Sequence, residues 1–531
     1  MKKANPNTIF SVMEDIKEGL KDASIKAGIE HPVVYVEHPD DISHGDFSSN
    51  VALIYSKKLK ANPKILAGKI VEEFNKILTE KSEGKKSEKK SNIKNEIEKE
   101  HDFSKIISSV DIAGPGFINI KLADNFFTKE IIKISSDYGE NYGKSNVNDG
   151  QKIMVEYTDP NPFKEFHIGH LMSNAIGESI ARILEFSGAN IKRANWQGDV
   201  GLHVAKAIWG AIALQRQEEA KQSIERDIKE NEVKSNQKEN ADLGIAFWGK
   251  AYAFGAKKYD SDEPTKKDIG IINKKIYNRE DSEINALYDK GRKESLQHFE
   301  SIYKKLGTKF DNYFFEGKEG NSGEGIVREF IKKGVFEESE GAVIFPGEKY
   351  GVHTRVFITS QGLPTYETKE IGLNTEKFKI YPDLSQSIII TANEQSDYFR
   401  VLFKVFSLIR PEIFQKTKHI SHGMMRLTTS KMGSRTGNVI TAEHLMGEME
   451  KLIEEKIKDR DFDDKEKGRL CEEVAIGAIK YQILRQAIGG DIIYDPKKSI
   501  SFEGDSGPYL QYACVRAMTV LKKAKEAGIL E

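Results

Sequence analysis

The first 140 residues alternate between helix-like and strand-like spacing of their apolar side chains. Residues 61–78 (ANPKILAGKIVEEFNKIL) have the spacing of an amphipathic helix. Residues 112–122 contain a Gly-Pro-Gly turn that is followed by the alternation of a half-buried strand. We therefore expect a small α+β domain over residues 1–140.

A charged, low-complexity stretch separates these two segments. Residues 83–101 (EGKKSEKKSNIKNEIEKEH) contain almost no apolar side chains, so they cannot bury enough apolar surface to offset the entropy of folding. We interpret the region near 80–103 as a solvated insertion. An arm that contacts RNA is the alternative, because runs of lysine attract phosphates.

From about residue 150 short apolar strands and helices alternate. Residues 152–158 (KIMVEYT) predict a strand that ends at a turn, and the following segment predicts a helix to about Ser187. Residues 191–201 predict a second strand and a loop. This order of strand, turn, helix and strand is typical of a parallel, doubly wound sheet.

The sheet pattern is interrupted and then resumes. Residues 205–345 are rich in helical spacing, whereas the apolar runs at 388–393 (IIITAN) and 419–424 (HISHGM) again predict strands. We expect one α/β domain over residues 141–445, with a doubly wound parallel sheet and a helical insertion near 205–345.

After about residue 440 the apolar pattern is helical throughout. Residues 471–488 have the apolar spacing of an amphipathic helix, and residues 509–524 have the same spacing. The apolar residues that share one broad helical face in the earlier segment are Val474, Ala478, Ile479, Ile483, Leu484 and Ile488. We therefore expect an all-α bundle over residues 446–531.

Composition narrows the class of protein. The 531 residues are 31% charged, and the longest apolar runs, such as SIIIT at 387–391, are far too short to cross a bilayer. The N-terminal segment lacks the apolar core of a secretory signal. Cys471 and Cys514 are the only cysteines, which excludes a cysteine-rich zinc site and favours the cytoplasm. The net charge of −1 leaves RNA binding open, because local basic patches attract nucleic acid.

The first candidate chemistry is a pair of histidines in NPFKEFHIGHLMSNAIG (161–177). A His-x-Gly-His pattern such as His167 to His170 is expected by chance only about 0.02 times in a chain with 12 His and 43 Gly. Polar residues at a helix start are one interpretation; a zinc site is a weaker one, because no nearby cysteine or third histidine completes it. The context favours a phosphate site, because a strand passes here into a helix N-terminus. Gly169 would let a flat ring lie against bare backbone.

The second candidate is the basic loop TTSKMGSRTGNVI (428–440). Lys431 and Arg435 stand among serines and glycines, Ser434 included. A surface turn is the simple interpretation. A mobile cationic loop after a late sheet strand also suits clamping a triphosphate.

Together the two segments resemble the paired HIGH and KMSKS signatures of class I aminoacyl-tRNA synthetases. Among these, the chain resembles the arginyl-tRNA synthetase family, and the match runs almost from end to end. The segments that carry the resemblance are VEYTDPNPFKEFHIGHL (155–171), NWQGDVGLHVAK (195–206), LPTYETKEIGL (363–373), HGMMRLTTSKMGSRTGN (422–438) and SFEGDSGPYLQYA (501–513). HGDFSSNVAL (44–53) and GPGFINIKL (114–122) resemble the extra N-terminal domain of that family.

The resemblance implies a fold and a reaction. The fold is a class I synthetase, Rossmann-like doubly wound parallel sheet with a helical insertion, joined to a tRNA-binding N-terminal domain and a helical anticodon-binding domain. In the reaction, ATP activates arginine with release of pyrophosphate, and the arginyl group then moves to tRNA. Positioning and cations near the phosphates carry the first step, because it needs no protein nucleophile. The matching residues are His167, His170 and Lys431 for catalysis, Gly169, Ser434 and Arg435 for ATP, and the backbone of Met424 and Met425 for adenine.

One departure from the family pattern concerns a lysine. In an alignment with KMSKS, the second lysine position of the loop is Ser434. The family often uses instead a lysine just upstream of HIGH, and the matching residue is Lys164. We expect Lys164 to contact phosphate; an ordinary surface lysine is the alternative.

Arginine recognition calls for carboxylates in a fixed fork. The resemblance assigns Glu156, Asn161, Tyr366 and Glu370 to arginine, although the family usually has aspartate at the position of Glu370. A turn asparagine and a half-buried tyrosine are the structural alternatives for Asn161 and Tyr366. Because charge and bidentate geometry distinguish arginine, we expect no editing domain.

The family also implies cofactors and partners. We expect ATP with Mg²⁺ on its phosphates, no zinc and no other metal site, an arginine-accepting tRNA that is needed for activation, no membrane contact, and a cytoplasmic monomer. The segment at 501–513 normally lies in the first half of the helical bundle. We therefore expect a truncated bundle over residues 446–531, which weakens the case for anticodon recognition.

Two other functions stay open. One is a class I synthetase for cysteine or glutamate, which the low cysteine content and the Glu156, Tyr366 and Glu370 set disfavour. The other is a catalytically reduced tRNA-binding paralogue. The intact histidine motif and Lys431 disfavour that function, whereas the short helical tail keeps it open.

Overall fold

The computed structural model describes two compact units, Met1–Val147 and Asn148–Glu531. The low-complexity insertion lies mostly outside the described residues, and so does the basic loop with Lys431, Ser434 and Arg435. The described residues are 9–39, 41–82, 106–228, 244–427, 440–501 and 503–529. Within these ranges no helix is long and apolar enough to cross a membrane.

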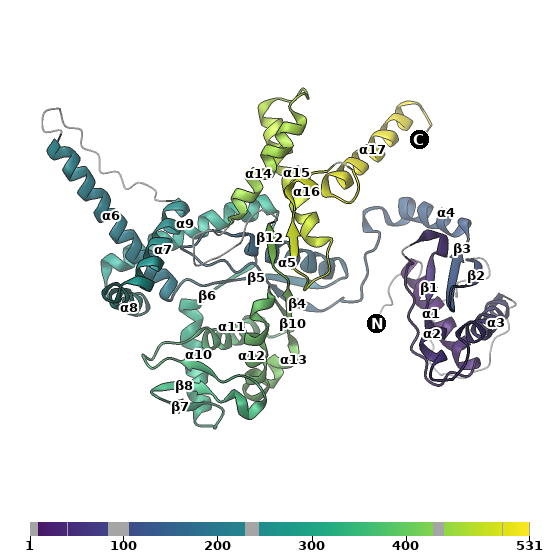
Figure 1. Cartoon of the computed structure of the whole chain (residues 1–531), viewed down its shortest axis with the longest axis horizontal. Coiled ribbons are helices and arrows are strands. Elements are labelled where there is room, and N and C mark those ends of the chain that lie inside the picture. Colours follow the sequence, from purple (N-terminus) through teal and green to yellow (C-terminus); the bar gives the residue numbers. More distant parts are fainter. Residues whose placement is uncertain are drawn as a thin grey trace. The chain divides into compact units, whose positions relative to one another are not determined.

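The first unit contains a three-stranded antiparallel sheet in the order β1-β3-β2, with helices packed on it (Figure 1). Its elements are α1 (Ile9–Lys26), η1 (Ile42–His44), β1 (Phe47–Ser49), α2 (Val51–Ser56), α3 (Pro63–Ser82), β2 (Ile107–Ala113), β3 (Phe117–Leu122), α4 (Asp124–Lys133), η3 (Ile134–Tyr138) and η4 (Gly139–Asn141). Ile16 of α1, Phe74 of α3 and Ile120 of β3 are buried in one core. The predicted helix and strand are α3 and β3, so this α+β prediction is confirmed.

The second unit is built on a five-stranded sheet in which all neighbouring strands are parallel. In spatial order the strands are β11 (Thr417–His422), β10 (Leu384–Ala392), β4 (Lys152–Glu156), β5 (Asn190–Gln197) and β6 (Asn312–Phe315). The chain runs outward from β4 to β6 and later returns to β10, so the order reverses between β4 and β10. The predicted doubly wound sheet is confirmed. Ligands bind such sheets at the carboxyl ends of the strands beside this reversal.

Helices cover both faces of the sheet, because β4 is apolar on both sides. Ile153 and Val155 enter a core with α5, α9, α14 and α15, whereas Met154 packs with Leu373 of α11. In Figure 1, α14 and α15 lie on the opposite side of the sheet from α10–α13. The helices of this unit are α5 (Ile168–Phe186), α6 (Leu202–Ile228), α7 (Gly244–Ser261), α8 (Glu263–Asn278), α9 (Ser282–Leu306), α10 (Glu316–Ile331), η5 (Gly347–Tyr350), α11 (Tyr366–Ile380), η6 (Asn393–Gln395), α12 (Ser396–Ile409), α13 (Pro411–Lys416), α14 (Ala442–Ile457), α15 (Asp464–Leu484), α16 (Pro496–Ser499) and α17 (Gly507–Glu526).

The helical insertion ends earlier than the sequence pattern indicated. Helices α6 to α8 and the start of α9 share a core of their own, but β6 lies inside the region near 205–345 and forms an edge of the main sheet. A small antiparallel sheet follows, formed by β7 (Glu337–Ser339), β8 (Ala342–Phe345) and β9 (Arg355–Ile358). These strands are too short to show a period of two in the sequence.

The C-terminal region is helical with one exception. Strand β13 (Ile492–Tyr494) pairs in parallel with β12 (Met425–Leu427), a partner that no local pattern reveals. Ala478, Ile479 and Ile483 of the predicted apolar face are buried, but α15 ends at Leu484, which is exposed, as is Ile488 beyond it. Helices α14 and α15 share the core of α5, so no separate core begins at residue 446.

Candidate active site

The two histidines cap the start of α5. His167 is the N-cap residue, and its Nδ1 atom accepts hydrogen bonds from the backbone N–H groups of Gly169 (3.1 Å) and His170 (3.4 Å). His170 Nδ1 accepts in turn from the backbone N–H of His167 at 3.2 Å. The histidines therefore form a reciprocal capping box. One role of the His-x-Gly-His motif is thus to stabilise the start of α5.

This capping also fixes where the ring protons lie. Because each Nδ1 accepts an N–H donor, the proton of each neutral ring lies on Nε2. Burial and the nearby charge of Lys164 lower the pKa of His167 to about 4. Burial, His167 and Lys164 lower the pKa of His170 well below its usual value. At neutral pH the stacked rings, 3.6 Å apart between centroids, therefore offer two Nε2–H donors and no positive charge, which differs from the cations expected here.

The residues that directly follow the basic loop lie beside the histidines. Ile168 N–H donates to Ile440 O at 3.1 Å, and Ala442 N–H donates to Phe166 O at 2.8 Å. Strand β12, which leads into the loop, contacts α5. The described segments on either side of the basic loop thus contact the start of α5, and the loop residues themselves lie outside the described ranges.

Backbone contacts remove Met424 from the predicted adenine site. Its N–H donates to Asp491 Oδ1 at 2.9 Å, and its C=O accepts from Ile492 N–H at 2.8 Å. Both groups are therefore used where β12 and β13 meet. In a parallel ladder the next residue turns its N–H and C=O to the other side, which leaves Met425 as the candidate.

Lys164 lies in the turn that precedes α5, half-buried beside another lysine. Its ammonium group is 4.8 Å from the centroid of the Tyr252 ring. Burial and the charge of Lys206 lower the pKa of Lys164. It forms no ion pair of 4.0 Å or less with any carboxylate of the described ranges, and it acts electrostatically on both histidines. These surroundings suit an anion.

A cluster of buried carboxyl groups begins at the carboxyl end of β4. Glu156 is 1% exposed, and its Oε2 lies 2.8 Å from Lys377 Nζ without the alignment of a hydrogen bond. Burial and Glu156 raise the pKa of Glu370 to about 8. Burial and Glu156 also raise the pKa of Asp159, which accepts a hydrogen bond from Trp196 N–H at 2.8 Å. Three carboxyl groups thus compete for one buried lysine, an arrangement that a bound cation would stabilise.

The other predicted arginine ligands lie around Glu316, which acts electrostatically on Glu370. A Cβ atom at Gly198 would lie 2.0 Å from Asn161 Oδ1 and 3.1 Å from Glu316 Oε1, so only glycine allows these two groups to approach here. Glu316 is buried and pairs with Lys369 Nζ at 2.7 Å. The ring of Tyr366, which is 55% exposed, lies 5.1 Å from the same ammonium group.

Glu316, Lys369, Asp159 and Lys377 were not predicted as site residues. Glu316 directly follows β6, just as Glu156 ends β4. An acidic residue at the carboxyl end of a parallel strand was therefore the available signal, and it was hidden because β6 was not recognised. The two lysines are interior residues of α11 and carry no local signal.

The turn between β4 and α5 has a strained backbone, and hydrogen bonds to side chains of α5 stabilise it. Thr158 has φ 81° and Asp159 has φ 47°, and a left-handed conformation costs a residue other than glycine about 1–3 kcal/mol. Thr158 N–H donates to Ser173 Oγ at 3.0 Å, and Thr158 Oγ1 accepts from Asn174 Nδ2 at 3.0 Å. These bonds fix the backbone that carries Glu156.

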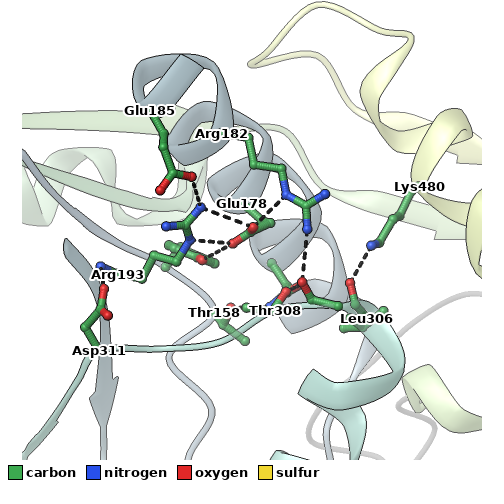
Figure 2. Close-up of polar contacts among 12 residues, drawn as sticks. Thr158, Glu178, Arg182, Glu185, Arg193, Leu306, Thr308, Asp311 and Lys480 are labelled. Atoms are coloured by element: carbon green, nitrogen blue, oxygen red, sulfur yellow. Dashed lines mark hydrogen bonds and ion pairs between the residues drawn. The ribbon is translucent and has the colours of Figure 1, made fainter. Parts of the chain in front are cut away.

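A polar network centred on Glu178 and Asn174 connects the same turn to neighbouring elements (Figure 2). Glu178 of α5 pairs with Arg182 at 2.7 Å and with Arg193 of β5 at 3.1 Å. Its Oε2 also accepts from the hydroxyl of the buried Tyr157 at 2.5 Å. Thr308 Oγ1 donates to Asn174 at 2.9 Å, so the loop after α9 joins the network.

The described ranges contain no cluster of three or more histidine, cysteine or acidic side chains that could hold a metal ion. The site is therefore assembled from neutral imidazole donors, a free lysine and buried carboxylates at the reversal point of a parallel sheet. Such a sheet, with a HIGH-type start of the helix that follows its central strand, is typical of a class I synthetase catalytic domain.

Comparisons with known proteins give the family. A model described as "tRNA synthetases class I (R), catalytic domain" matches residues 134–495, and one described as "Arginyl tRNA synthetase N terminal domain" matches residues 11–87. The chain belongs to the arginyl-tRNA synthetase family, as its sequence predicted.

Individual relatives agree over most of the chain. The arginine–tRNA ligase of Treponema denticola is 31% identical over 421 residues, which are 78% of this chain and 68% of the relative. That of Fusobacterium nucleatum is 29% identical over 489 residues, which are 91% and 76%. The arginyl-tRNA synthetase structure from Thermus thermophilus has a TM-score of 0.68 at 18% identity and covers 97% of this chain and 82% of that chain. This last match shows a shared fold.

Proposed function

We propose that this chain attaches L-arginine to the 3′ end of arginine-accepting tRNA, by forming arginyl-adenylate from ATP and then transferring the arginyl group. The observation that carries the proposal is the cluster of buried carboxyl groups after β4, in the same strand–helix connection that ends in the capped histidines of α5. It combines a binding place for a guanidinium group with donors for phosphate at one edge of the sheet. Family membership supports the same reaction.

In the activation step the arginine carboxylate attacks the α-phosphorus of ATP, and pyrophosphate leaves. His167 and His170 donate from Nε2 to phosphate oxygens, and Lys164 supplies a nearby positive charge. Gly169, the backbone of Met425, and Lys431, Ser434 and Arg435 of the basic loop complete the ATP site. Removing one donor that faces developing charge costs about 3–4 kcal/mol in the transition state. Mg²⁺ enters with the ATP phosphates as part of the substrate.

Arginine selection follows from buried charge. Glu370 and Glu316 are placed to meet the guanidinium group, while Glu156 and Asn161 are placed nearer the α-amino group, and Tyr366 closes the pocket. The guanidinium group is planar and always charged, so it satisfies two carboxylates in a fixed fork. Apolar amino acids would leave those carboxylates buried and unpaired.

We also infer the partners of the two units. The first unit, which the N-terminal domain model matches, contacts tRNA, and tRNA binding is needed for arginine activation. The enzyme works as a cytoplasmic monomer. Light scattering of the free and tRNA-bound chain tests the oligomeric state directly.

ATP–pyrophosphate exchange with each amino acid in turn, with and without tRNA, tests the activity. We expect exchange with arginine alone, and only when tRNA is present. Exchange with cysteine or glutamate would contradict the assignment. An absence of exchange under every condition, with tRNA binding retained, would favour a catalytically reduced tRNA-binding paralogue.

A further inference from the structure

Lys377 of α11 is a buried lysine to which the proposed reaction gives no role. Its side chain is completely excluded from solvent. Its ammonium group lies 2.8 Å from Glu156 Oε2 and donates a hydrogen bond to Asn374 Oδ1 at 3.3 Å. Replacing a buried ion pair by apolar side chains is often neutral or stabilising, so stability alone does not explain a lysine at this position.

Asn374 extends this contact to a second carboxyl group. It follows Glu370 by one helical turn and precedes Lys377 by another, so the three side chains share one face of α11. The Nδ2 atom of Asn374, which is itself fully buried, donates to Glu370 Oε1 at 3.0 Å. A continuous chain of polar contacts therefore runs from Glu156 through Lys377 and Asn374 to Glu370.

The elements at both ends of this polar chain have fixed backbones. Glu156 is the last residue of β4, which pairs with β10 on one side and with β5 on the other. Glu370 lies within α11, which packs closely on α10, because a Cβ atom at Gly372 would lie only 2.1 Å from Glu319 O. Since neither backbone can move without breaking these contacts, the polar chain holds the two carboxyl groups at a constant distance.

The charges around Lys377 make this arrangement dependent on the lysine. Burial and Glu156 raise the pKa of Glu370 to about 8, and the charge of Lys377 opposes that rise. Burial and Glu156 also raise the pKa of Asp159, and Lys377 again has the opposite effect. Without the lysine, buried carboxyl groups from β4, the following turn and α11 would face one another with no cation between them.

We propose that Lys377 and Asn374 are positioning residues that determine the length of the amino acid which the site accepts. The inference rests on the proposed function, in which Glu156 lies nearer the α-amino group of arginine and Glu370 meets its guanidinium group. A substrate that is one methylene longer or shorter can place only one of its two positive groups correctly. The other group then leaves a buried carboxylate without its partner, which costs binding free energy.

Titration calorimetry of the full-length chain with arginine and with homoarginine, which is one methylene longer, tests the proposal. The unmodified chain should bind arginine at least about tenfold more tightly than homoarginine. Lys377→Met and Asn374→Leu break the polar chain with side chains of similar size. Each should reduce this preference at least about fivefold, mainly through weaker binding of arginine. Lys377→Arg keeps a positive charge beside Glu156 and should retain the preference.

Lys379→Met provides the matched control, because Lys379 lies on the same helix but is exposed and pairs with Glu376. This variant should bind both amino acids like the unmodified chain. Thermal unfolding identifies the variants that are folded. An unchanged preference in folded Lys377→Met or Asn374→Leu would overturn the proposal. Because calorimetry requires no catalysis, a chain that binds with this preference but shows no ATP–pyrophosphate exchange would overturn the proposed activity and still support the selection by length.

Discussion

At the scale of single residues, the site that we propose for arginine consists of carboxyl groups that are difficult to ionise together. Glu370 is buried next to Glu156, and its pKa is about 8, well above the usual value of a glutamate. At pH 7 Glu370 therefore keeps its proton in the free protein. A guanidinium group beside it would favour the carboxylate, so binding and ionisation are linked.

This linkage predicts that arginine binding releases protons below pH 8. Affinity should rise from pH 6 to pH 8 and change little above it, because Glu370 is then already ionised. Calorimetry in two buffers of different ionisation enthalpy measures the number of protons released, which we expect to approach one at pH 7. Glu370→Gln should bind arginine weakly and without proton release. Release of a proton by this variant would assign the effect to another group.

Lys164 gives a second prediction at this scale. Lys164→Ala should slow ATP–pyrophosphate exchange by a factor of about 10²–10³, the usual result of losing one charge-stabilising group. Affinity for tRNA, measured by filter binding, should change little. Lys206→Ala, which removes the neighbouring cation on α6, provides the control and should slow exchange far less. Equal and modest effects of Lys164→Ala on exchange and on tRNA binding would contradict a phosphate contact.

At the scale of elements, one residue at the start of α5, His167, caps the helix and also has the catalytic function that we propose. His167 accepts backbone hydrogen bonds through Nδ1, and its Nε2–H is free to donate. These two functions can be separated, because asparagine caps helices well but has no donor at the position of Nε2.

His167→Ala and His167→Asn should therefore differ in stability but not in activity. The alanine variant should lose about 1 kcal/mol of unfolding free energy through the lost cap, whereas the asparagine variant should keep most of it. Exchange should fall in both by about 3–4 kcal/mol of transition-state stabilisation. Urea unfolding and exchange assays measure the two effects. Recovery of exchange by asparagine would mean that His167 acts only as a cap.

Helices and strands also differ in whether the local sequence predicts them. The order of strand, turn and helix around β4 and α5 is local, so the apolar pattern and the histidine motif predicted it correctly. Strands β6 and β13 depend on partners far along the chain, and their residues carry no distinctive period. The buried ion pair of Glu316 and Lys369 and the engaged backbone of Met424 depend on the same long-range pairing. Sequence therefore located the motifs, but it could not show which of their groups are free.

At the scale of the whole second unit, polar contacts connect the C-terminal helices to the turn after β4, where we propose that arginine binds. Lys480 of α15 donates to the backbone oxygen of Leu306, the last residue of α9, at 2.5 Å, and the loop that contains Thr308 follows directly. Thr308 of that loop contacts Asn174 of α5, which holds the strained Thr158 beside Glu156. Figure 2 shows Lys480, Leu306, Thr308 and Thr158 within one set of polar contacts. A shift of α15 would therefore reach the turn that carries the proposed arginine ligands.

A double-mutant cycle of Lys480→Met and Asn174→Ala tests this connection. Each change removes hydrogen bonds worth about 1 kcal/mol and should raise the KM for arginine several-fold, with little effect on the KM for ATP. Because both residues act through the same loop, their effects should be coupled by at least about 0.5 kcal/mol. Lys305→Met removes an exposed ion pair with Glu472 between the same two helices and should show no coupling. Additive effects of Lys480→Met and Asn174→Ala would mean that α15 and the arginine pocket are independent.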